Sequence, residues 1–144
     1  MAAFLYRMAG SPAYEPDDAA RARFNDVDGK TPHAKEIWWL ADARISAGFD
    51  DGGFHPYESV KRCDMAAFLH RLSVRAIGET PAGNASFADV SASTPHAEDI
   101  LWLAGNGVSA GWGEGESREY RGMLEITRCD MAAFLHRMDQ KDLA

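Results

Sequence analysis

Cysteine is scarce in this chain of 144 residues, which contains only Cys63 and Cys129. Two cysteines cannot form a disulfide-rich scaffold, so the fold must rest on other interactions. Long apolar runs are absent too. No stretch reaches the roughly 18 apolar residues of a membrane-spanning helix, and the first residues lack the basic start and long apolar core of a signal peptide. We therefore expect neither a membrane span nor a signal peptide in this sequence.

Basic residues are fewer than acidic residues in this chain. The chain has 15 Lys and Arg against 22 Asp and Glu, and its formal net charge is −7. Binding along the phosphates of a nucleic acid needs a basic face, so this balance argues against nucleic acid as a partner. It leaves room for an anionic ligand held by one or two arginines. The hydrophobic share of 46% is typical of a soluble globular protein.

Self-similarity is what the sequence has in abundance. The segment FNDVDGKTPHAKEIWWLADARISAGF, from Phe24, aligns without a gap with FADVSASTPHAEDILWLAGNGVSAGW, from Phe87, at an offset of 63. The match continues from KRCDMAAFLHR at 61–71 to TRCDMAAFLHR at 127–137, where the offset is 66. The later copy therefore carries three extra residues in its middle loop. The string MAAFLYR at 1–7 repeats the closing part of both copies.

The repeats divide the chain into three predicted segments. Residues 1–23 hold the closing helix of a first, incomplete repeat and a linker, 24–86 hold a second repeat and a linker, and 87–144 hold a third repeat. The linkers, at 10–23 and 74–86, are rich in proline, glycine and small polar residues, as is usual between repeats.

Each complete repeat is predicted to fold as helix, loop, helix. The first helix is expected to begin at the string TPH, with Thr31 and Thr94 as N-caps. Pro32 and Pro95 then fall at the first helical position, where the missing N–H of proline costs nothing. In the second repeat this helix is expected to end near Ala43.

The second helix of each repeat has clearer signals. Thr127 with Asp130 resembles a capping box with Asp in place of Glu, whereas the second repeat has Lys61 at the capping position and lacks that cap. A stripe of apolar residues at i, i+3, i+4 and i+7 follows in all three copies: Met1, Phe4, Leu5 and Met8; Met65, Phe68, Leu69 and Leu72; Met131, Phe134, Leu135 and Met138. One helix pair buries too little to be stable, so we expect the three stripes to form one shared core.

The order of these motifs resembles the S-layer homology (SLH) repeat of bacterial surface proteins. The family pattern is roughly F-x-D-V, an apolar helix with an early His, [IV]-[ST]-x-G-aromatic, F-x-P, and [IV]-[TS]-R-x-[ED] before an aliphatic helix that closes in Arg. The second repeat fills this pattern with Phe24, Asp26, Val27, His33, Ile45, Ser46, Gly48, Phe49, Phe54, Pro56, Val60, Arg62 and Asp64. The third repeat fills it with Phe87, Asp89, Val90, His96, Val108, Ser109, Gly111, Trp112, Ile126, Thr127, Arg128 and Asp130.

The resemblance implies both a fold and a ligand. The implied fold is all-α, with SLH-like helix–loop–helix repeats packed as a pseudo-threefold helical bundle whose first repeat is incomplete. The implied ligand is secondary cell-wall polysaccharide or a peptidoglycan-linked glycan, often with acidic pyruvyl ketals, held in grooves between repeats. The groove arginine of the family corresponds to Arg62 and Arg128. Asp64 and Asp130 belong to the same motif, at a position where the family has Glu.

Arg62 and Arg128 are also candidates on physical grounds. Each is expected in the first turn of its helix, where backbone N–H groups and the positive end of the helix dipole favour an anion. A guanidinium adds a bidentate fork for a carboxylate. The alternative for each arginine is a surface salt bridge with a neighbouring carboxylate.

Trp39 and Trp102 occupy the same place in the two complete repeats. At 100° per residue Trp39 points away from the main apolar face of its own helix. An indole can stack on a sugar ring and donate its N–H to a hydroxyl, so both residues are candidate ligand contacts. The alternative is packing against the neighbouring repeat.

Gly48-Phe49 and Gly111-Trp112 place an aromatic residue directly after a glycine turn. The glycines are expected to allow a left-handed backbone or a close approach. An aromatic ring on such a loop either flanks a ligand groove or covers the core. Both pairs are included among the candidate ligand-binding residues.

Neither metal nor catalytic chemistry is predicted. His33 and His96 have no second pair of ligands beside them, so we expect no metal site, and no feature calls for a cofactor. Cys63 and Cys129 are expected to be small buried residues at helix starts, with a disulfide left open. No nucleophile–base pair or phosphate loop has suitable spacing, so the chain is not expected to be an enzyme.

These observations predict a non-catalytic module that binds bacterial cell-wall polysaccharide through grooves between repeats. It would anchor a secreted protein outside the cell, at the cell wall or cell surface, and an upstream catalytic or adhesive domain is expected in the parent protein. The alternative is a structural or self-assembly module that uses the same grooves for protein–protein contacts.

Overall fold

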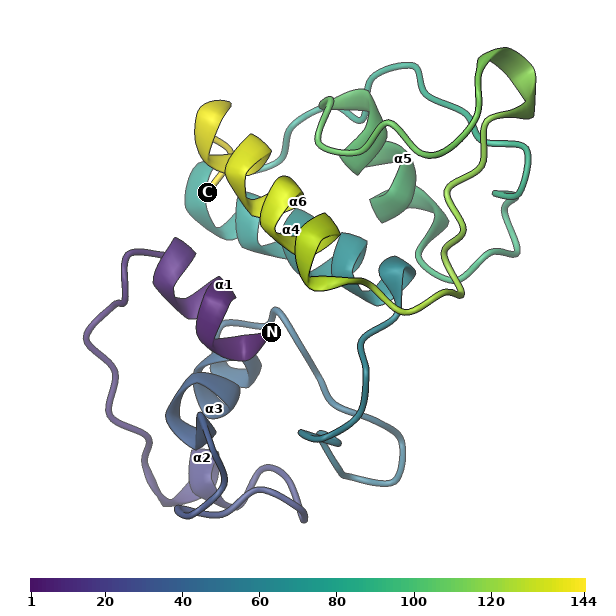
Figure 1. Cartoon of the computed structure of the whole chain (residues 1–144). Coiled ribbons are helices and arrows are strands. Elements are labelled where there is room, and N and C mark those ends of the chain that lie inside the picture. Colours follow the sequence, from purple (N-terminus) through teal and green to yellow (C-terminus); the bar gives the residue numbers. More distant parts are fainter. The chain divides into compact units, whose positions relative to one another are not determined.

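The computed structural model describes all residues from 1 to 144 and is built of helices without any β-strand (Figure 1). The α-helices are α1 (Ala2–Met8), α2 (Asp18–Arg21), α3 (Ala34–Asp42), α4 (Arg62–Ile77), α5 (Ala97–Gly105) and α6 (Arg128–Gln140), and a 3₁₀ turn spans Gly115–Ser117. The β-type pairing is limited to two isolated bridges, Lys61 with Glu125 and Trp112 with Glu119. The predicted all-α class is confirmed. No helix has the length and apolar character needed to cross a bilayer.

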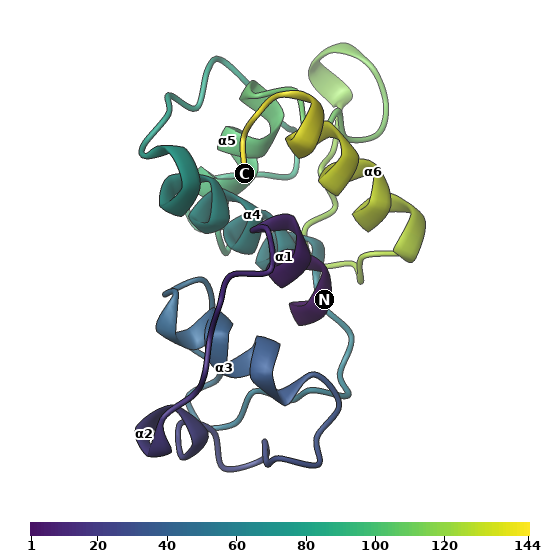
Figure 2. The same cartoon turned by 90° about the vertical axis from the view of Figure 1, so that its left-hand side faces the viewer.

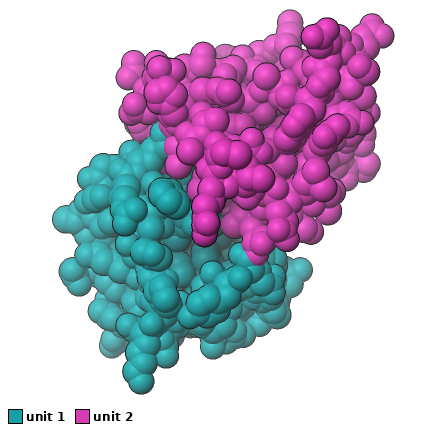
Figure 3. All heavy atoms as spheres, viewed as in Figure 1, with its two compact units in different colours: residues 1–58 teal, residues 59–144 magenta.

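The chain divides into two compact units, 1–58 and 59–144 (Figure 3). In the first unit α1 and α2 pack against α3, and in the second α4 packs against α5 (Figures 1 and 2). Each unit therefore pairs the closing helix of one sequence repeat with the opening helix of the next. The packing units are offset from the sequence repeats at 24–86 and 87–144, whose boundaries stay a prediction.

The core of the first unit is formed where α1 meets α3. Leu5 and Leu40 are fully buried, and the Tyr6 ring contacts the Trp39 indole edge-on with 5.2 Å between centroids. On α1 the buried face differs from the predicted stripe, because Phe4 is 49% exposed while Ala2, Ala3 and Tyr6 are buried. The α1 helix is thus an integral part of the first unit.

In the second unit the predicted apolar stripe is most completely buried on α4, where Met65, Leu69 and Leu72 are buried. On α6 only Phe134 and Met138 of the predicted stripe are fully buried. The packing of all three stripes around one common axis stays a prediction.

The first helix of each repeat begins later than the sequence suggested. The N-caps of α3 and α5 are His33 and His96, with left-handed φ values of 63° and 59°. Thr31 does not cap the helix, since its hydroxyl accepts the N–H of Asp28 and its carbonyl accepts the N–H of Ala34, which closes a turn. The predicted caps at Thr31 and Thr94 are therefore wrong by two positions. Histidine is one of the few non-glycine residues enriched in the left-handed region.

The second helices begin where the sequence predicted. Thr127 caps α6, because its hydroxyl accepts the N–H of Asp130 at 3.1 Å. The N-cap of α4 is Lys61, which offers no side-chain cap. Instead the carbonyls of Leu124 and Gly122 accept the first two N–H groups of α4, those of Arg62 and Cys63, at 2.9 and 3.0 Å. The start of α4 is therefore held by the following repeat.

Candidate functional site

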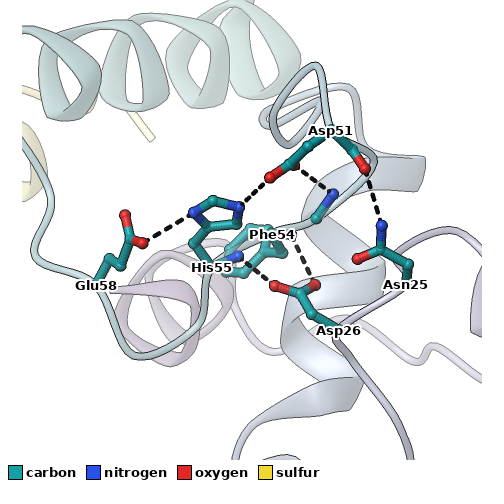
Figure 4. Close-up of polar contacts among 7 residues, drawn as sticks. Asn25, Asp26, Asp51, Phe54, His55 and Glu58 are labelled. Carbon is teal, nitrogen blue, oxygen red and sulfur yellow. Dashed lines mark hydrogen bonds and ion pairs between the residues drawn. The ribbon is translucent and has the colours of Figure 1, made fainter.

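The aspartate of the F-x-D-V motif orders one loop in each repeat. The Asp26 carboxylate accepts the backbone N–H groups of Phe54 and His55, both at 2.8 Å (Figure 4). Asp89 accepts those of Tyr120 and Arg121 at 2.8 and 2.7 Å in the third repeat. Two charge-assisted bonds to consecutive amides fix the backbone that follows the glycine–aromatic turn.

The two glycines of that turn are required by both backbone and packing. Gly48 and Gly111 have left-handed φ values of 78° and 71°. A Cβ at either position would lie 2.5 Å from a ring carbon, of Phe24 in one case and of Phe87 in the other. The predicted need for glycine is confirmed at both positions.

The three-residue difference between the repeats is confined to the tip of this loop. The N–H of Phe49 donates to the carbonyl of Gly53 at 2.8 Å, and the N–H of Trp112 donates to that of Glu119 at 2.8 Å. Because Gly53 and Glu119 are equivalent at the offset of 66, the extra residues lie between Trp112 and Glu119. The 3₁₀ turn Gly115–Ser117 accommodates them.

Arg62 lies at the centre of a cluster of aromatic and polar side chains. Only 3% of the residue is exposed, although it carries a charge. Its guanidinium carbon lies 4.1, 5.0 and 5.3 Å from the ring centroids of Trp112, Tyr120 and Phe134. The Arg62 Nε donates to the Tyr120 carbonyl at 3.1 Å, and Nη1 donates to Asp130 at 2.9 Å. The cluster joins the second repeat to the third.

Burial and pairing have opposite effects on Arg62. Desolvation lowers the pKa of the guanidinium, while Tyr120 and Asp130 raise it. Arginine still stays protonated, because its pKa starts far above neutrality. The Tyr120 hydroxyl donates to the Arg62 carbonyl at 2.9 Å, and burial raises the pKa of this phenol. The remaining guanidinium nitrogen, Nη2, makes no hydrogen bond within the chain.

The structure brings together three of the predicted site residues, Arg62, Trp112 and Asp130. Arg128 is not part of such a cluster: its side chain is exposed and makes no hydrogen bond, ion pair or ring contact. Asp64 lies 3.6 Å from His96 as an ion pair. The two equivalent arginines therefore have different surroundings.

Phe49 and Trp112 are both accessible, and each stacks on the residue that Asp26 or Asp89 positions. The Phe49 ring is 54% exposed and stacks on His55 with 4.4 Å between centroids. Trp112 is half-buried, and Arg121 lies 5.2 Å from its centroid in addition to Arg62. Phe49 thus carries one stacking partner where Trp112 carries two.

His55 is held by carboxylates on both ring nitrogens (Figure 4). Nε2 lies 2.8 Å from Asp51, and Nδ1 lies 3.0 Å from Glu58. The hydrogen bond with Asp51 raises the pKa of His55, and the backbone N–H of Gly53 lowers the pKa of Asp51. Asn25 donates to the Asp51 carbonyl at 2.8 Å, so the whole loop is tied together.

Trp39 and Trp102 lie in the interior, with exposed fractions of 3% and 1%. Trp39 packs on Tyr6, and Trp102 stacks on His70 with 4.4 Å between ring centroids. The Trp102 indole N–H donates to Thr80 at 2.9 Å. In both cases the ring contact comes from the preceding repeat. Neither ring offers a face to a glycan, and the alternative of packing against the neighbouring repeat is what the structure shows.

The two cysteines are free and differ in exposure. Cys63 is buried as predicted, and desolvation raises the pKa of its thiol. Cys129 is exposed, so the prediction of a buried thiol is wrong there. The reason is that the loop of the following repeat covers the start of α4 but nothing covers the start of α6.

Sequence reasoning missed several members of the Arg62 cluster. Tyr120 and Phe134 were not considered as site residues, although the offset of 66 pairs them with Phe54 and Phe68, so that an aromatic residue recurs at both positions. Arg121 was missed as well. Recurrence of ring type between repeats is the signal that could have identified the two aromatic residues.

Comparison with known proteins agrees with the repeat pattern. Residues 23–66 and 86–132 match the S-layer homology domain, and together these matches cover more than half of the chain. The chain is also similar to the surface-layer 125 kDa protein of Lysinibacillus sphaericus, with 28% identity over 119 residues. That alignment takes in 81% of this chain and 9% of the relative, so the chain spans less than a tenth of the relative's length. The chain belongs to the S-layer homology domain family.

Proposed function

We propose that this chain is a non-catalytic module that binds a bacterial cell-wall glycan and anchors a larger extracellular protein to the wall. S-layer homology domains are the wall-anchoring parts of S-layer proteins, and the relative named above is a surface-layer protein. The observation that carries the proposal is the cluster in which Arg62 from one repeat meets Trp112 and Asp130 from the next.

The chemistry of this cluster suits a sugar with an acidic substituent. Arg62 Nη2 is free to bind a carboxylate, while Nε and Nη1 hold the guanidinium in a fixed orientation. The half-buried Trp112 ring supplies an aromatic surface beside it, which suits the apolar face of a sugar. Asp130 and Arg121 add hydrogen-bonding groups for hydroxyls.

Other predicted contacts enter the proposal as secondary subsites. Gly48 and Phe49 form a turn in the second repeat that is equivalent to the turn of Gly111 and Trp112 in the third repeat. The exposed Arg128 is a further cation, and Asp64 occupies the position of Asp130. Weak subsites of this kind gain avidity along a repeating polymer.

Sedimentation with purified cell walls tests the function. The wild-type chain should co-sediment with intact walls, and binding should fall once the non-peptidoglycan polymers are stripped. Binding that survives stripping assigns the ligand to peptidoglycan, and absence of binding to both preparations overturns the proposal.

A conservative change tests the Arg62 site itself. Arg62→Lys keeps the charge but loses the Nη2 donor, so we expect wall binding to weaken about tenfold while circular dichroism is unchanged. Arg23→Ala removes a cation from an exposed position and is the matched control. Equal binding by Arg62→Lys and wild type would show that the glycan does not use this guanidinium.

The relative is far longer than this chain, which supports the proposal that the module is joined to catalytic or adhesive domains. Its place would then be outside the cell, at the wall or surface.

A further inference from the structure

In each complete repeat one planar side chain lies over the ring of the glycine–aromatic turn. In the third repeat it is Arg121, whose guanidinium carbon lies 5.2 Å from the centroid of the Trp112 ring. In the second repeat it is His55, whose ring stacks on Phe49 with 4.4 Å between centroids and 22° between the ring planes. Arg121 and His55 are equivalent at the offset of 66. The same arrangement is therefore built twice, with two different side chains.

The backbone of this covering residue is unusual in both repeats. Arg121 and His55 have left-handed φ values of 58° and 55°, a conformation that is uncommon for residues other than glycine. Asp89 and Asp26 hold it in place, because their carboxylates accept the N–H groups of Arg121 and His55 at 2.7 and 2.8 Å. A strained backbone that is maintained in both repeats points to a role for the side chain that it directs over the ring.

Trp112 has two guanidiniums beside it, and they are held differently. Arg62 is 3% exposed, and two hydrogen bonds fix its guanidinium. The Arg121 side chain is 45% exposed, and its Nε donates to Glu119 at 3.0 Å. An exposed ion pair of this kind holds a side chain only weakly. A ligand that reaches Trp112 from solvent therefore meets Arg121, which is the guanidinium that can move.

We propose that Arg121 is a cover that has to leave the Trp112 ring before a sugar can stack there, and that His55 is the equivalent cover on Phe49. This inference rests on the proposed binding of a wall glycan. A stacked sugar and a guanidinium compete because both use the π face of the indole.

The cover makes the Trp112 ring selective. A ligand that displaces Arg121 must replace the lost contact, which a glycan does by offering hydroxyl or acid oxygens to the released guanidinium. An apolar surface offers no such acceptor. The cover therefore keeps the half-buried indole from adhering to apolar surfaces while no glycan is bound.

The two covers are held with different strength. His55 has a carboxylate at each ring nitrogen, with Asp51 at 2.8 Å and Glu58 at 3.0 Å (Figure 4). Arg121 has one carboxylate, that of Glu119. We therefore expect the ring in the third repeat to be uncovered more easily than the ring in the second.

Acrylamide quenching of tryptophan fluorescence tests the cover without any glycan. The other three tryptophans are at most 4% exposed, so the quenching reports on Trp112. Arg121→Asn removes the guanidinium, and asparagine tolerates the left-handed backbone. The quenching constant should rise about threefold, as expected for loss of an exposed cation–π contact. Arg23→Ala, which removes an unrelated exposed cation, should be quenched like wild type.

A second variant tests the competition with the ligand. Glu119→Gln keeps Arg121 but weakens the ion pair that holds it, so binding to purified cell walls should tighten about twofold. Glu116→Gln removes an exposed carboxylate from the same loop and is the matched control for charge. Half-saturation of co-sedimentation is measured for both variants. Binding by Glu119→Gln that is no tighter than binding by Glu116→Gln overturns the inference.

Failure of the cover and failure of the proposed function give different results. A wild-type chain that binds no walls overturns the proposed function, and the competition falls with it. A wild-type chain that binds walls but is quenched as strongly as Arg121→Asn keeps the proposed function and overturns the cover.

Discussion

At the scale of residues, the sequence Arg-Cys-Asp has two different outcomes in one chain. At 62–64 the arginine is buried among three rings and the cysteine is enclosed, whereas at 128–130 both side chains face solvent. Both helices begin at the same place in the repeated sequence. The burial is decided by whether another repeat lies against that start, which no short stretch of sequence reveals.

The His55 loop gives a pH-dependent prediction at this scale. The folded pKa of His55 is raised from 6.5, so its stabilising effect is fully present below that pH and is lost as pH rises through the folded pKa. The folded pKa of Asp51 is lowered from 3.8, so its effect is present above that pH and is lost as pH falls through the folded value. The loop should be most stable between about pH 4 and 6.5.

The variant His55→Asn isolates this effect, since asparagine tolerates the left-handed φ of 55° at this position. Urea unfolding at several pH values should show the largest difference between variant and wild type near pH 5 and a smaller one at pH 8. His136→Asn, at an exposed position, is the control. A difference that grows toward pH 8 contradicts the expected sign.

At the scale of elements, the starts of α4 and α6 show that the first N–H groups of a helix can be capped by its own sequence or by another repeat. The α6 start carries its own cap in Thr127, whereas α4 lacks one and depends on the carbonyls of Gly122 and Leu124. The helix α4 should therefore respond to changes in the third repeat. In contrast, the start of α6 is determined by its own sequence.

Replacement of Arg62 tests how much the second unit depends on this junction. Arg62→Met leaves Asp130 and the Tyr120 carbonyl without their partner. We expect a loss of about 2–3 kcal/mol in the free energy of unfolding, below the range for a fully enclosed pair because the Asp130 side chain is 35% exposed.

The equivalent variant Arg128→Met is the matched control. Its side chain is exposed and unpartnered, so the free energy of unfolding should change by less than about 0.5 kcal/mol. Both are measured by denaturant titration at low protein concentration. Equal effects of the two substitutions would show that the Arg62 cluster contributes nothing particular to stability.

At the scale of the whole molecule, sequence repeats and packing units are out of step. The closing helices of the first two repeats pack on the opening helix of the next repeat, α1 on α3 and α4 on α5. The repeat 24–86 taken alone is thereby separated from the partners of both of its helices, α1 and α5. The compact units 1–58 and 59–144 keep those partners together.

Two fragments test whether the chain folds by its sequence repeats or by its compact units. The fragment 59–144 should be helical and unfold cooperatively, because it retains α4 on α5. The fragment 24–86, one complete sequence repeat, should have little helix, because α3 lacks α1 and α4 lacks α5. Circular dichroism with thermal unfolding measures both. A well-folded 24–86 together with a disordered 59–144 would contradict the offset.

Much of the fold follows from the sequence, because the repeat supplies each signal twice. The cap at Thr127, the glycine turns and the buried face of α4 are local features and were predicted. For Trp39 and Trp102 the sequence left two alternatives open, a ligand contact and packing against the neighbouring repeat, because their partners Tyr6 and His70 lie in the preceding repeat. The helix starts at His33 and His96 were missed because Thr-Pro usually marks a cap, whereas here it forms a turn.

The extra residues between Trp112 and Glu119 have a practical consequence. The hydrogen bond that closes this loop tip has the same length in both repeats, 2.8 Å, so a longer tip leaves the backbone below it unchanged. All residues of the tip from Gly113 to Ser117 are exposed. It is therefore a permissive point for grafting a fluorophore-bearing peptide or an epitope, which would let the module be followed on living cells.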